Sequence, residues 1–313
     1  MLYGAIAARR MAQTGIDAGL PVICVGNFHV GGAGKTPTVL ALSALLRELG
    51  ERPVVLSRGY GGRLPGPVLV DPAAHEAADV GDEPLMMATR VPVVVSRARA
   101  EGVGLAKAQG ASVIVMDDGF QNPSIAKDLA LIVIDGARGL GNARVFPAGP
   151  LRAPLPPQLG RTDALVMVGS GDAGEAVAAR VAASGKPVFR AQLQPDAQVV
   201  AALAARPILA FAGIGDPERF FRTLRASGLE VKVARSFPDH HPFSLDEIDS
   251  LIQQARRQGL TVVTTEKDLA RFSGSKAGRS DLGVSAFPVT LQFSDPQALR
   301  SFVARRLSAA QKR

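Results

Sequence analysis

The sequence predicts an α/β fold in which a doubly wound, mostly parallel sheet is followed by a second, smaller α/β domain. Continuous apolar runs rich in β-branched residues alternate with helical stretches, which is typical of a parallel sheet covered on both faces. This pattern breaks within residues 194–206, and a new strand, turn and helix begin at Pro207. We therefore expect a core domain over 21–195, a hinge over 194–206 and a smaller domain over 206–313. The strands expected in the core domain are 22–25, 53–57, 91–96, 112–116, 129–134, 164–169 and 187–192.

The residues before the first strand predict a short amphipathic helix within residues 1–20. Arg9 and Arg10 stand beside an apolar fringe, a composition typical of a helix that lies on anionic lipid. A surface helix packed on the domain would show the same pattern, so both interpretations stay open. The fringe is formed by Leu2, Tyr3, Ile6 and Met11.

A glycine-rich turn follows the first strand and opens an apolar helix. Such a turn directs several backbone N–H groups into one concavity, where the helix dipole adds partial positive charge. Lys35 supplies a point charge for the β- and γ-phosphates, and the Thr36 hydroxyl is placed to bind Mg²⁺. His29 replaces one glycine of the usual pattern, and an ordinary turn with a surface lysine is the alternative. We predict a P-loop NTPase-like core whose nucleotide contacts come from Gly31, Gly32, Ala33, Gly34, Lys35 and Thr36.

Two carboxylates follow the apolar run 113–116. Ligands of a parallel sheet gather at the carboxyl ends of its strands, and a carboxylate at that position can bind the magnesium of a nucleotide directly or through water. Asp117 and Asp118 occupy this position, and together with Thr36 they are the expected metal ligands. A solvated Asp-Asp-Gly turn is the other interpretation.

Three further stretches place charged residues before predicted helices. Asp82 lies in an acidic turn and either caps a helix or accepts the proton of an acceptor hydroxyl. His240 lies in a short loop and either belongs to a helix cap or orients such a base. Lys267 follows the apolar run 260–263 and either begins a helix or closes over the nucleotide. The residues alone leave each pair of interpretations open.

The composition limits the partner and the compartment. A formal charge of +8 over 313 residues favours an anionic partner, such as a phosphorylated substrate, acidic lipid or nucleic acid. Without Trp, and with two Tyr, nucleic acid is the least expected of the three. Cys24 is the single cysteine, which excludes a disulfide framework and indicates a reducing, cytoplasmic compartment. No uninterrupted apolar run is long enough to predict a transmembrane helix.

Several ordered motifs together resemble the tetraacyldisaccharide 4'-kinase family, the lipid A 4'-kinases of Gram-negative bacteria. The resemblance covers nearly the whole chain, and the order of the motifs is more specific than any one of them. The family's phosphate loop generally lacks the glycine that His29 replaces here. The motifs are VICVGNFHVGGAGKTP, VVLSRGYGG, VGDEP, VMDDGFQN, IDGARGLGNARVFPAGPLR, FAGIGDPERF, FPDHHPF and VVTTEKD.

The resemblance implies transfer of the ATP γ-phosphoryl group to the 4'-hydroxyl of an acylated glucosamine disaccharide 1-phosphate, which gives lipid IVA. ATP and Mg²⁺ are the implied cofactors, and a peripheral position at the cytoplasmic face of the inner membrane is the implied location. By motif position, Asp82 is the base and His240 assists it, Lys35 and Thr36 hold the phosphates and Mg²⁺, and Asp117 and Asp118 serve the metal. We also expect Lys35 to take part in catalysis and Lys267 to bind the nucleotide. The residues implied to line the phosphate or sugar side are Arg58, Tyr60, Gln121 and Arg152.

Family members usually begin with a longer hydrophobic segment, whereas only residues 2–11 precede the core here, so the membrane anchor stays open. Two other functions fit part of the sequence. A P-loop ATPase, or a kinase for a soluble acidic metabolite, would explain the loop and the Asp pair. A nucleotide-gated regulatory protein that binds nucleic acid would explain the charge.

Overall fold

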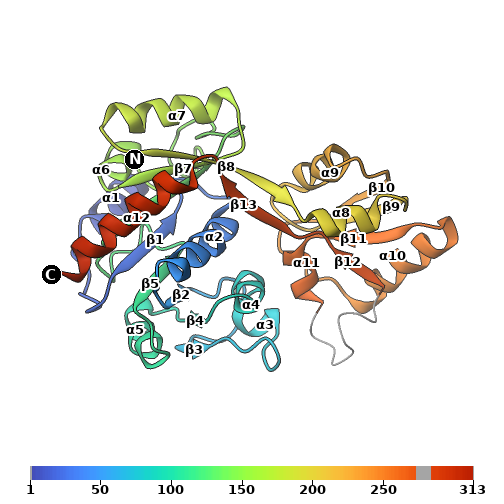
Figure 1. Ribbon diagram of the computed structural model, residues 1–313, viewed down its shortest axis with the longest axis horizontal. Coiled ribbons are helices and arrows are strands. Elements are labelled where there is room, and N and C mark those ends of the chain that lie inside the picture. The colour runs from blue at the N-terminus through green and yellow to red at the C-terminus, as the bar shows by residue number, and fades with distance from the viewer. Residues whose placement is uncertain (1, 273–282, 313) are drawn as a thin grey trace.

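The computed structural model describes residues 2–272 and 283–312, and two sheets organise them (Figure 1). Nine described strands form the large sheet in the order β13-β8-β7-β6-β1-β5-β2-β4-β3. Its strands pair in parallel except at the two edges, where β13 and β3 run antiparallel to their neighbours. The doubly wound, mostly parallel fold is therefore confirmed. The strands are β1 Val22–Gly26, β2 Pro53–Ser57, β3 Val68–Leu69, β4 Val93–Val95, β5 Val113–Asp117, β6 Leu129–Asp135, β7 Ala164–Val168, β8 Val188–Pro195 and β13 Val289–Phe293.

Helices cover both faces of the large sheet. The central strands are buried along their full length, because each face packs against apolar helix residues. On one face lie α2 Lys35–Glu48, α4 Asp82–Ala88 and α12 Pro296–Gln311, and α3 Ala77–Val80 precedes α4. On the other face lie α1 Leu2–Met11, α5 Arg99–Ala108, α6 Leu155–Gly160 and α7 Asp172–Ala183.

The smaller domain has a parallel sheet whose four described strands follow the order β10-β9-β11-β12. Helices α8 and α9 pack on one of its faces and α10 on the other, while α11 also contacts α4 of the large domain. Pro217 is the first residue of α9, as the sequence predicts. The elements are α8 Ala197–Leu203, β9 Ile208–Ala212, α9 Pro217–Ala226, β10 Val231–Ser236, α10 Leu245–Gln258, β11 Thr261–Thr264, α11 Glu266–Arg271 and β12 Val284–Ala286.

The chain divides between the two sheets differently from the expected boundaries. Helix α8 lies inside the expected hinge 194–206, but its Leu203 is buried in the core of the smaller domain. After β12 the chain returns to the large sheet, where β13 pairs with β8 and α12 buries Leu299 and Val303. The edge strand β13 satisfies the hydrogen bonds of β8, and α12 covers apolar surface beside α2, so residues 289–311 belong to the large domain.

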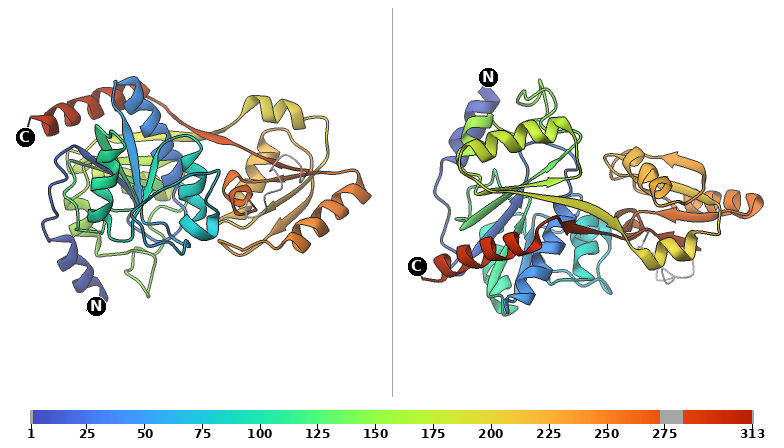
Figure 2. Two further views of the ribbon diagram at one scale, coloured as in Figure 1. Left: turned by 90° about the horizontal axis from the view of Figure 1, so that it is seen from below. Right: turned by 45° about the horizontal axis from the view of Figure 1, so that its top comes forward.

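Two strands therefore connect the domains. Strands β8 and β13 run side by side from the large sheet toward the smaller domain (Figure 1), and α12 extends away from that domain (Figure 2). A paired connection restricts twisting more than a single linker does, because the ladder hydrogen bonds couple the two strands.

Helix α1 packs on the large domain while leaving part of its surface exposed. Its Gly4 approaches Pro154 closely, and Met11 is buried. Arg9, Arg10 and Ile6 are exposed, Ile6 to 52%. The side chains of Leu2 and Tyr3, which belong to the expected apolar fringe, lie outside the described residues. None of the helices described here has the length and apolar character needed to cross a membrane.

Candidate active site

The glycine-rich turn joins the centre of the large sheet to helix α2. Strand β1 lies between β6 and β5, and α2 begins at Lys35. Gly34 immediately precedes it with a φ of 92°, a left-handed conformation that favours glycine. A side chain at Gly34 would also meet Val168 at 3.2 Å. The Asn27 amide donates to the carbonyl of Gly31 at 3.2 Å and holds the turn from within.

His29, the exception in the motif, is a buried side chain of the loop. It is 4% exposed and its Nδ1 lies 3.0 Å from the carbonyl of Val30. Its backbone forms a bridge with Leu151, which brings the 150–152 segment beside the loop. Burial lowers the pKa of His29, so its ring is neutral at physiological pH and adds no charge to the loop.

Lys35 and the two carboxylates lie at the same edge of the sheet. The Lys35 ammonium is 3.8 Å from Asp118 Oδ1. Arg152 binds the same carboxylate with two parallel hydrogen bonds, Nη1 to Oδ1 at 2.9 Å and Nη2 to Oδ2 at 3.0 Å. Burial would raise the pKa of Asp118, but the charges of Lys35 and Arg152 outweigh it and hold the pKa below its usual value. Asp118 is therefore ionised and fixed in orientation.

Asp117 has a different environment from its neighbour. Its Oδ2 accepts a hydrogen bond from Ser57 at 3.1 Å, whereas its buried Oδ1 has no hydrogen-bond partner among the described residues. Burial, together with the charges of Glu83 and Asp118, raises the pKa of Asp117 to about 7. A buried acceptor without a donor is costly unless a cation or water meets it.

Asp117 fits a magnesium ion that keeps most of its ligands from phosphate and water. No cluster of three or more His, Cys, Asp or Glu side chains suited to a metal occurs within the described part of the chain. Mg²⁺ at nucleotide sites needs only one or two carboxylates beside the phosphates. The unpartnered Asp117 oxygen is such a carboxylate donor.

A buried arginine supports the turn that carries both carboxylates. Arg99 is 4% exposed and donates to the backbone carbonyls of Asp117 and Asp118 at 2.9 and 3.0 Å. Asp118 has a positive φ of 48°, uncommon for a residue with a side chain. The two hydrogen bonds from Arg99 stabilise this backbone conformation.

Asp82 lies at the contact between the domains. It begins α4 of the large domain and is 5% exposed. Its Oδ2 is 3.0 Å from Nδ1 of His240 and 2.7 Å from Nε of Arg271, both from the smaller domain. Burial would raise the pKa of Asp82. The hydrogen bond from His240 and the charges of Lys267 and Arg271 outweigh burial and hold the pKa far below its usual range. Asp82 is thus a buried carboxylate ion.

Lys267 lies among acidic groups beside this pair. Its ammonium is 3.1 Å from Glu83 Oε1, 3.8 Å from Asp239 Oδ1 and 3.5 Å from Nε2 of His240. Burial would lower the pKa of Lys267, but the nearby carboxylates outweigh it and raise the pKa. The ring of Tyr60 lies 5.4 Å from that of His240. The structure thus brings Tyr60, Asp82, His240 and Lys267 together.

The smaller domain lies directly against the phosphate loop. A side chain at Gly215 would come within 3.9 Å of the backbone nitrogen of Gly32 and 3.3 Å of Asp239 Oδ2. An ion pair joins Arg219 of α9 to Asp135 at the end of β6. The loop therefore faces both domains.

The remaining predicted substrate residues have different surroundings. Gln121 donates to the carbonyl of Asn27 at 2.7 Å and to Gln158 at 2.9 Å, so it supports the chain that leads into the phosphate loop. Arg58 is exposed, and Tyr60 is 72% exposed although its ring approaches His240. Arg152 binds Asp118 and is one quarter exposed. Of this group, Tyr60 and Arg152 contact residues predicted to be catalytic or metal-binding.

Two residues without a role predicted from the sequence also belong to this site: Arg271 contacts Asp82, and Glu83 contacts Lys267. A signal for Arg271 was present, because residues four apart on a helix share a face and Arg271 is four residues after Lys267. The contact with Asp82 spans 189 residues of sequence and has no local signature.

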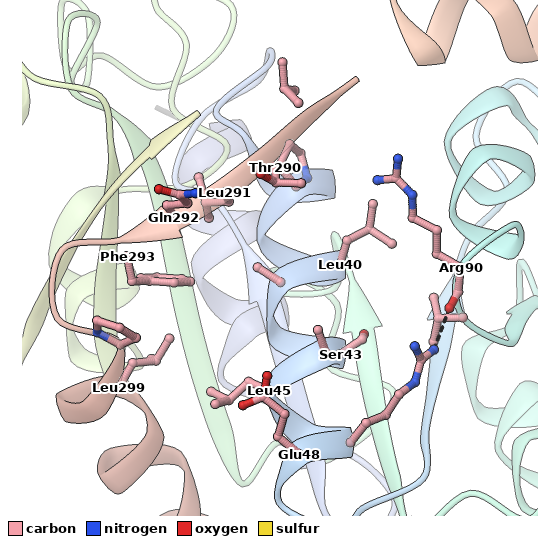
Figure 3. A pocket seen from close by; sticks show the side chains of 17 residues that line it. Leu40, Ser43, Leu45, Glu48, Arg90, Thr290, Leu291, Gln292, Phe293 and Leu299 are labelled. Atoms are coloured by element: carbon pink, nitrogen blue, oxygen red, sulfur yellow. Dashed lines mark hydrogen bonds between the residues drawn. The ribbon is translucent and has the colours of Figure 1, made fainter. Parts of the chain in front are cut away.

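A cavity of about 640 Å³ lies away from this site, between α2, β13 and the start of α12 (Figure 3). Its walls are mainly apolar and include Leu40, Leu291 and Phe293, and at one rim Arg47 donates to the carbonyl of Arg90 at 2.6 Å. It contains no carboxylate and histidine pair, so the polar groups suited to catalysis are at the phosphate loop and not in this cavity.

Known proteins resemble the chain over its whole length. A family model described as tetraacyldisaccharide-1-P 4'-kinase matches residues 1–308. The tetraacyldisaccharide 4'-kinase of Bradyrhizobium sp. strain BTAi1 is 80% identical over 100% of this chain and 91% of its own length. That of Nitrobacter winogradskyi is 65% identical over 96% of this chain and 90% of its own length. The crystal structure of LpxK from Aquifex aeolicus, an "apo" form in complex with ATP, has a TM-score of 0.74 at 28% identity and covers 98% of this chain and 96% of that one. The chain belongs to the tetraacyldisaccharide-1-P 4'-kinase family.

Proposed function

We propose that this protein transfers the γ-phosphoryl group of ATP to the 4'-hydroxyl of a tetraacyldisaccharide 1-phosphate, giving lipid IVA. The observation that carries the proposal is that these groups share one edge of the sheet. There Lys35 forms an ion pair with Asp118, and the charge of Glu83, next to Asp82, raises the pKa of Asp117. A phosphate cradle, a metal ligand and a separate buried carboxylate are the parts that a phosphoryl transfer to an alcohol requires. Family membership supplies the identity of the acceptor.

The phosphate loop would hold the triphosphate. The N–H groups at Gly32 and Gly34 and the ammonium of Lys35 would bind the β- and γ-phosphate oxygens, because a glycine-rich turn at a helix N-terminus binds anions and Lys35 lies at the same edge as Asp118. Asp117 and the Thr36 hydroxyl would hold Mg²⁺, which neutralises phosphate charge when bound. Asp118, fixed by Arg152, would keep Lys35 directed toward the phosphates.

Asp82 would accept the proton of the 4'-hydroxyl. As the new O–P bond forms and the bond from the γ-phosphorus to the β-phosphate oxygen breaks, the proton passes to the Asp82 carboxylate. The transition state is loose and demands little from the base, so an ionised carboxylate of low pKa is adequate when it is well placed. His240 would hold that carboxylate in place through its 3.0 Å contact.

A peripheral position on the cytoplasmic face of the inner membrane suits the acceptor and the N-terminal helix. The acyl chains of the acceptor stay in the bilayer, while ATP is supplied from the cytoplasm. Helix α1 exposes Ile6 together with Arg9 and Arg10, the combination that binds anionic lipid. Flotation with vesicles containing acidic lipid tests this: Ile6→Asp should reduce binding, and equal binding would remove α1 from the proposal.

Phosphorylation of the lipid tests the activity directly. We expect purified protein, Mg-ATP and the acylated disaccharide 1-phosphate in micelles to give a product heavier by one phosphoryl group, measured by mass spectrometry. Lys35→Ala should give none, because the loop loses its cation. Rapid turnover of a water-soluble acceptor with no effect of micelles would favour a soluble acidic substrate instead. Salt-sensitive retention on nucleic acid without phosphoryl transfer would favour a regulatory protein.

A further inference from the structure

Arg271 has more contacts with the proposed catalytic centre than its place on a short helix suggests. Its side chain is 6% exposed. Nε donates to Asp82 Oδ2 at 2.7 Å, and Nη2 lies 2.5 Å from the same oxygen as an ion-pair contact outside hydrogen-bond alignment. Nη1 donates to Asp268 and to the carbonyl of Gly213, both at 2.6 Å. One guanidinium thus joins the smaller domain to the carboxylate at the start of α4.

Other groups of the smaller domain hold the Arg271 guanidinium in place. Asp268 is fully buried and accepts the N–H of Gly213 with both oxygens at 3.2 Å, as well as the Thr265 hydroxyl at 2.7 Å. Because Asp268 is held by these donors, its contact with Arg271 fixes the guanidinium before the acceptor arrives. The backbone of His240 donates to the carbonyl of Gly213 at 3.1 Å, so Arg271 and His240 are anchored at the same turn.

The two oxygens of Asp82 have separate surroundings. Oδ2 is occupied by His240 and Arg271. Oδ1 accepts the backbone N–H of Glu83 at 2.8 Å, its single hydrogen bond among the described residues. A carboxylate oxygen has two lone-pair sites, so Oδ1 retains one for a hydroxyl proton.

We propose that Arg271 is a positioning residue for phosphoryl transfer: together with His240 it binds Oδ2 of Asp82 and directs Oδ1 toward the acceptor hydroxyl. The proposal rests on the proposed role of Asp82 as base. It assigns to the smaller domain two groups that orient the base, an aromatic ring and a permanent cation. Arg271 itself does not touch the reacting atoms.

The charges around Asp82 determine what loss of Arg271 would do. Lys267 and His240 face Asp82 from the smaller domain, while Glu83 on α4 and Asp239 on the 237–244 loop are acidic. Without Arg271, a buried carboxylate would keep one full cation nearby, so its pKa would rise. Because that pKa starts far below its usual range and His240 and Lys267 still lower it, Asp82 would stay ionised near neutral pH. The loss of Arg271 would therefore act on the orientation of the carboxylate.

Measurement of kcat and KM near neutral pH with Mg-ATP and the acylated disaccharide tests the proposal. Arg271→Gln should lower kcat by about tenfold or more, in the range of a misplaced base. The KM for ATP should change by less than about twofold. Arg271→Lys keeps the charge without the fork, and should restore only part of kcat.

Arg90→Gln is the matched control. Arg90 forms an ion pair with Glu266, which joins the large domain to α11. Among the described residues, Arg90 does not contact Asp82. The control should change kcat by less than about twofold. A kcat for Arg271→Gln within about twofold of the wild-type value, or an equal loss in Arg90→Gln, would overturn the proposal.

Three further readouts separate the possible failures. Binding of a fluorescent ATP analogue to Arg271→Gln reports whether the variant is folded. If it is not, Arg271→Lys supplies a second test of whether Arg271 positions the Asp82 carboxylate. A wild-type protein that makes no phosphorylated lipid would reject the proposed function itself. Full activity of Asp82→Asn would reject Asp82 as the base.

Discussion

Arg152 holds both carboxylate oxygens of Asp118, at 2.9 and 3.0 Å, while Lys35 lies 3.8 Å from one of them. The three groups come from separate places: the loop after β6, the end of β5 and the start of α2. The paired geometry fixes the carboxylate plane, which a single ammonium contact would leave free to rotate. Orientation of Lys35 at the phosphate loop therefore depends on an arginine outside the loop.

Replacement of Arg152 by lysine should lower kcat for phosphoryl transfer by about tenfold, because one ammonium cannot reproduce the two parallel hydrogen bonds. Steady-state kinetics with Mg-ATP and the disaccharide measures the effect. Arg144→Lys is the control, an exposed arginine on the same loop. Equal losses in the two variants would show that the loop is sensitive to any arginine change and that the Asp118 contact has no particular role.

Asp82→Ala should abolish detectable phosphorylation of the disaccharide and leave ATP binding nearly intact. The change removes the proposed base and leaves Gly34 and Lys35 unaltered, so the nucleotide site keeps its contacts. Turnover is followed by mass, and ATP binding by isothermal titration. Turnover at the wild-type rate would reject the base assignment, whereas loss of ATP binding would show that Asp82 supports the loop instead.

His240→Ala should lower turnover by about tenfold, since Asp82 keeps Arg271 but loses one donor. His241→Ala is the neighbouring control, because His241 contacts Glu247 at the start of α10 and not Asp82. Initial rates for the two variants are compared at saturating ATP. A rate for His240→Ala equal to that of the wild type would favour the interpretation of His240 as part of a helix cap.

The stability contributed by Asp82 should depend on pH in a defined direction. Its folded pKa lies below the unfolded value of about 3.9, so its contribution is complete above that value and is lost as the pH falls through the folded pKa. At pH 7, Asp82→Asn should lower the free energy of unfolding by about 1.5 to 3 kcal/mol, because the buried Arg271 loses one of its two carboxylate partners and keeps Asp268. Denaturant titrations at pH 7 and below pH 4 check this. A difference that grows on acidification would contradict it.

Leu299→Ala should destabilise the large domain by about 2 to 5 kcal/mol, because it leaves a cavity where α12 packs beside α2. Leu245→Ala, at a position that is 58% exposed on the smaller domain, should change stability by less than about 0.5 kcal/mol. Chemical denaturation with and without ATP measures both. No loss in Leu299→Ala would mean that α12 contributes little to the ATP-binding domain.

The sequence by itself determined the parallel sheet, the glycine turn at Lys35 and the carboxylates at Asp117 and Asp118. These depend on local rules: apolar runs form buried strands, glycine permits the positive φ at Gly34, and residues after parallel strands share one edge. The residue that replaces the usual glycine, His29, was also identified there, but its burial became known from the structure.

Only the tertiary structure decided how the two domains meet. The return of residues 289–311 to the large sheet and the ion pair of Asp82 with Arg271 join segments far apart in the chain. Such contacts arise from burial and charge pairing between elements, which leave no period or spacing in the sequence. The unequal ionisation of Asp117 and Asp118 has the same origin: burial and the charge of Glu83 raise the pKa of Asp117, whereas Lys35 and Arg152 lower that of Asp118.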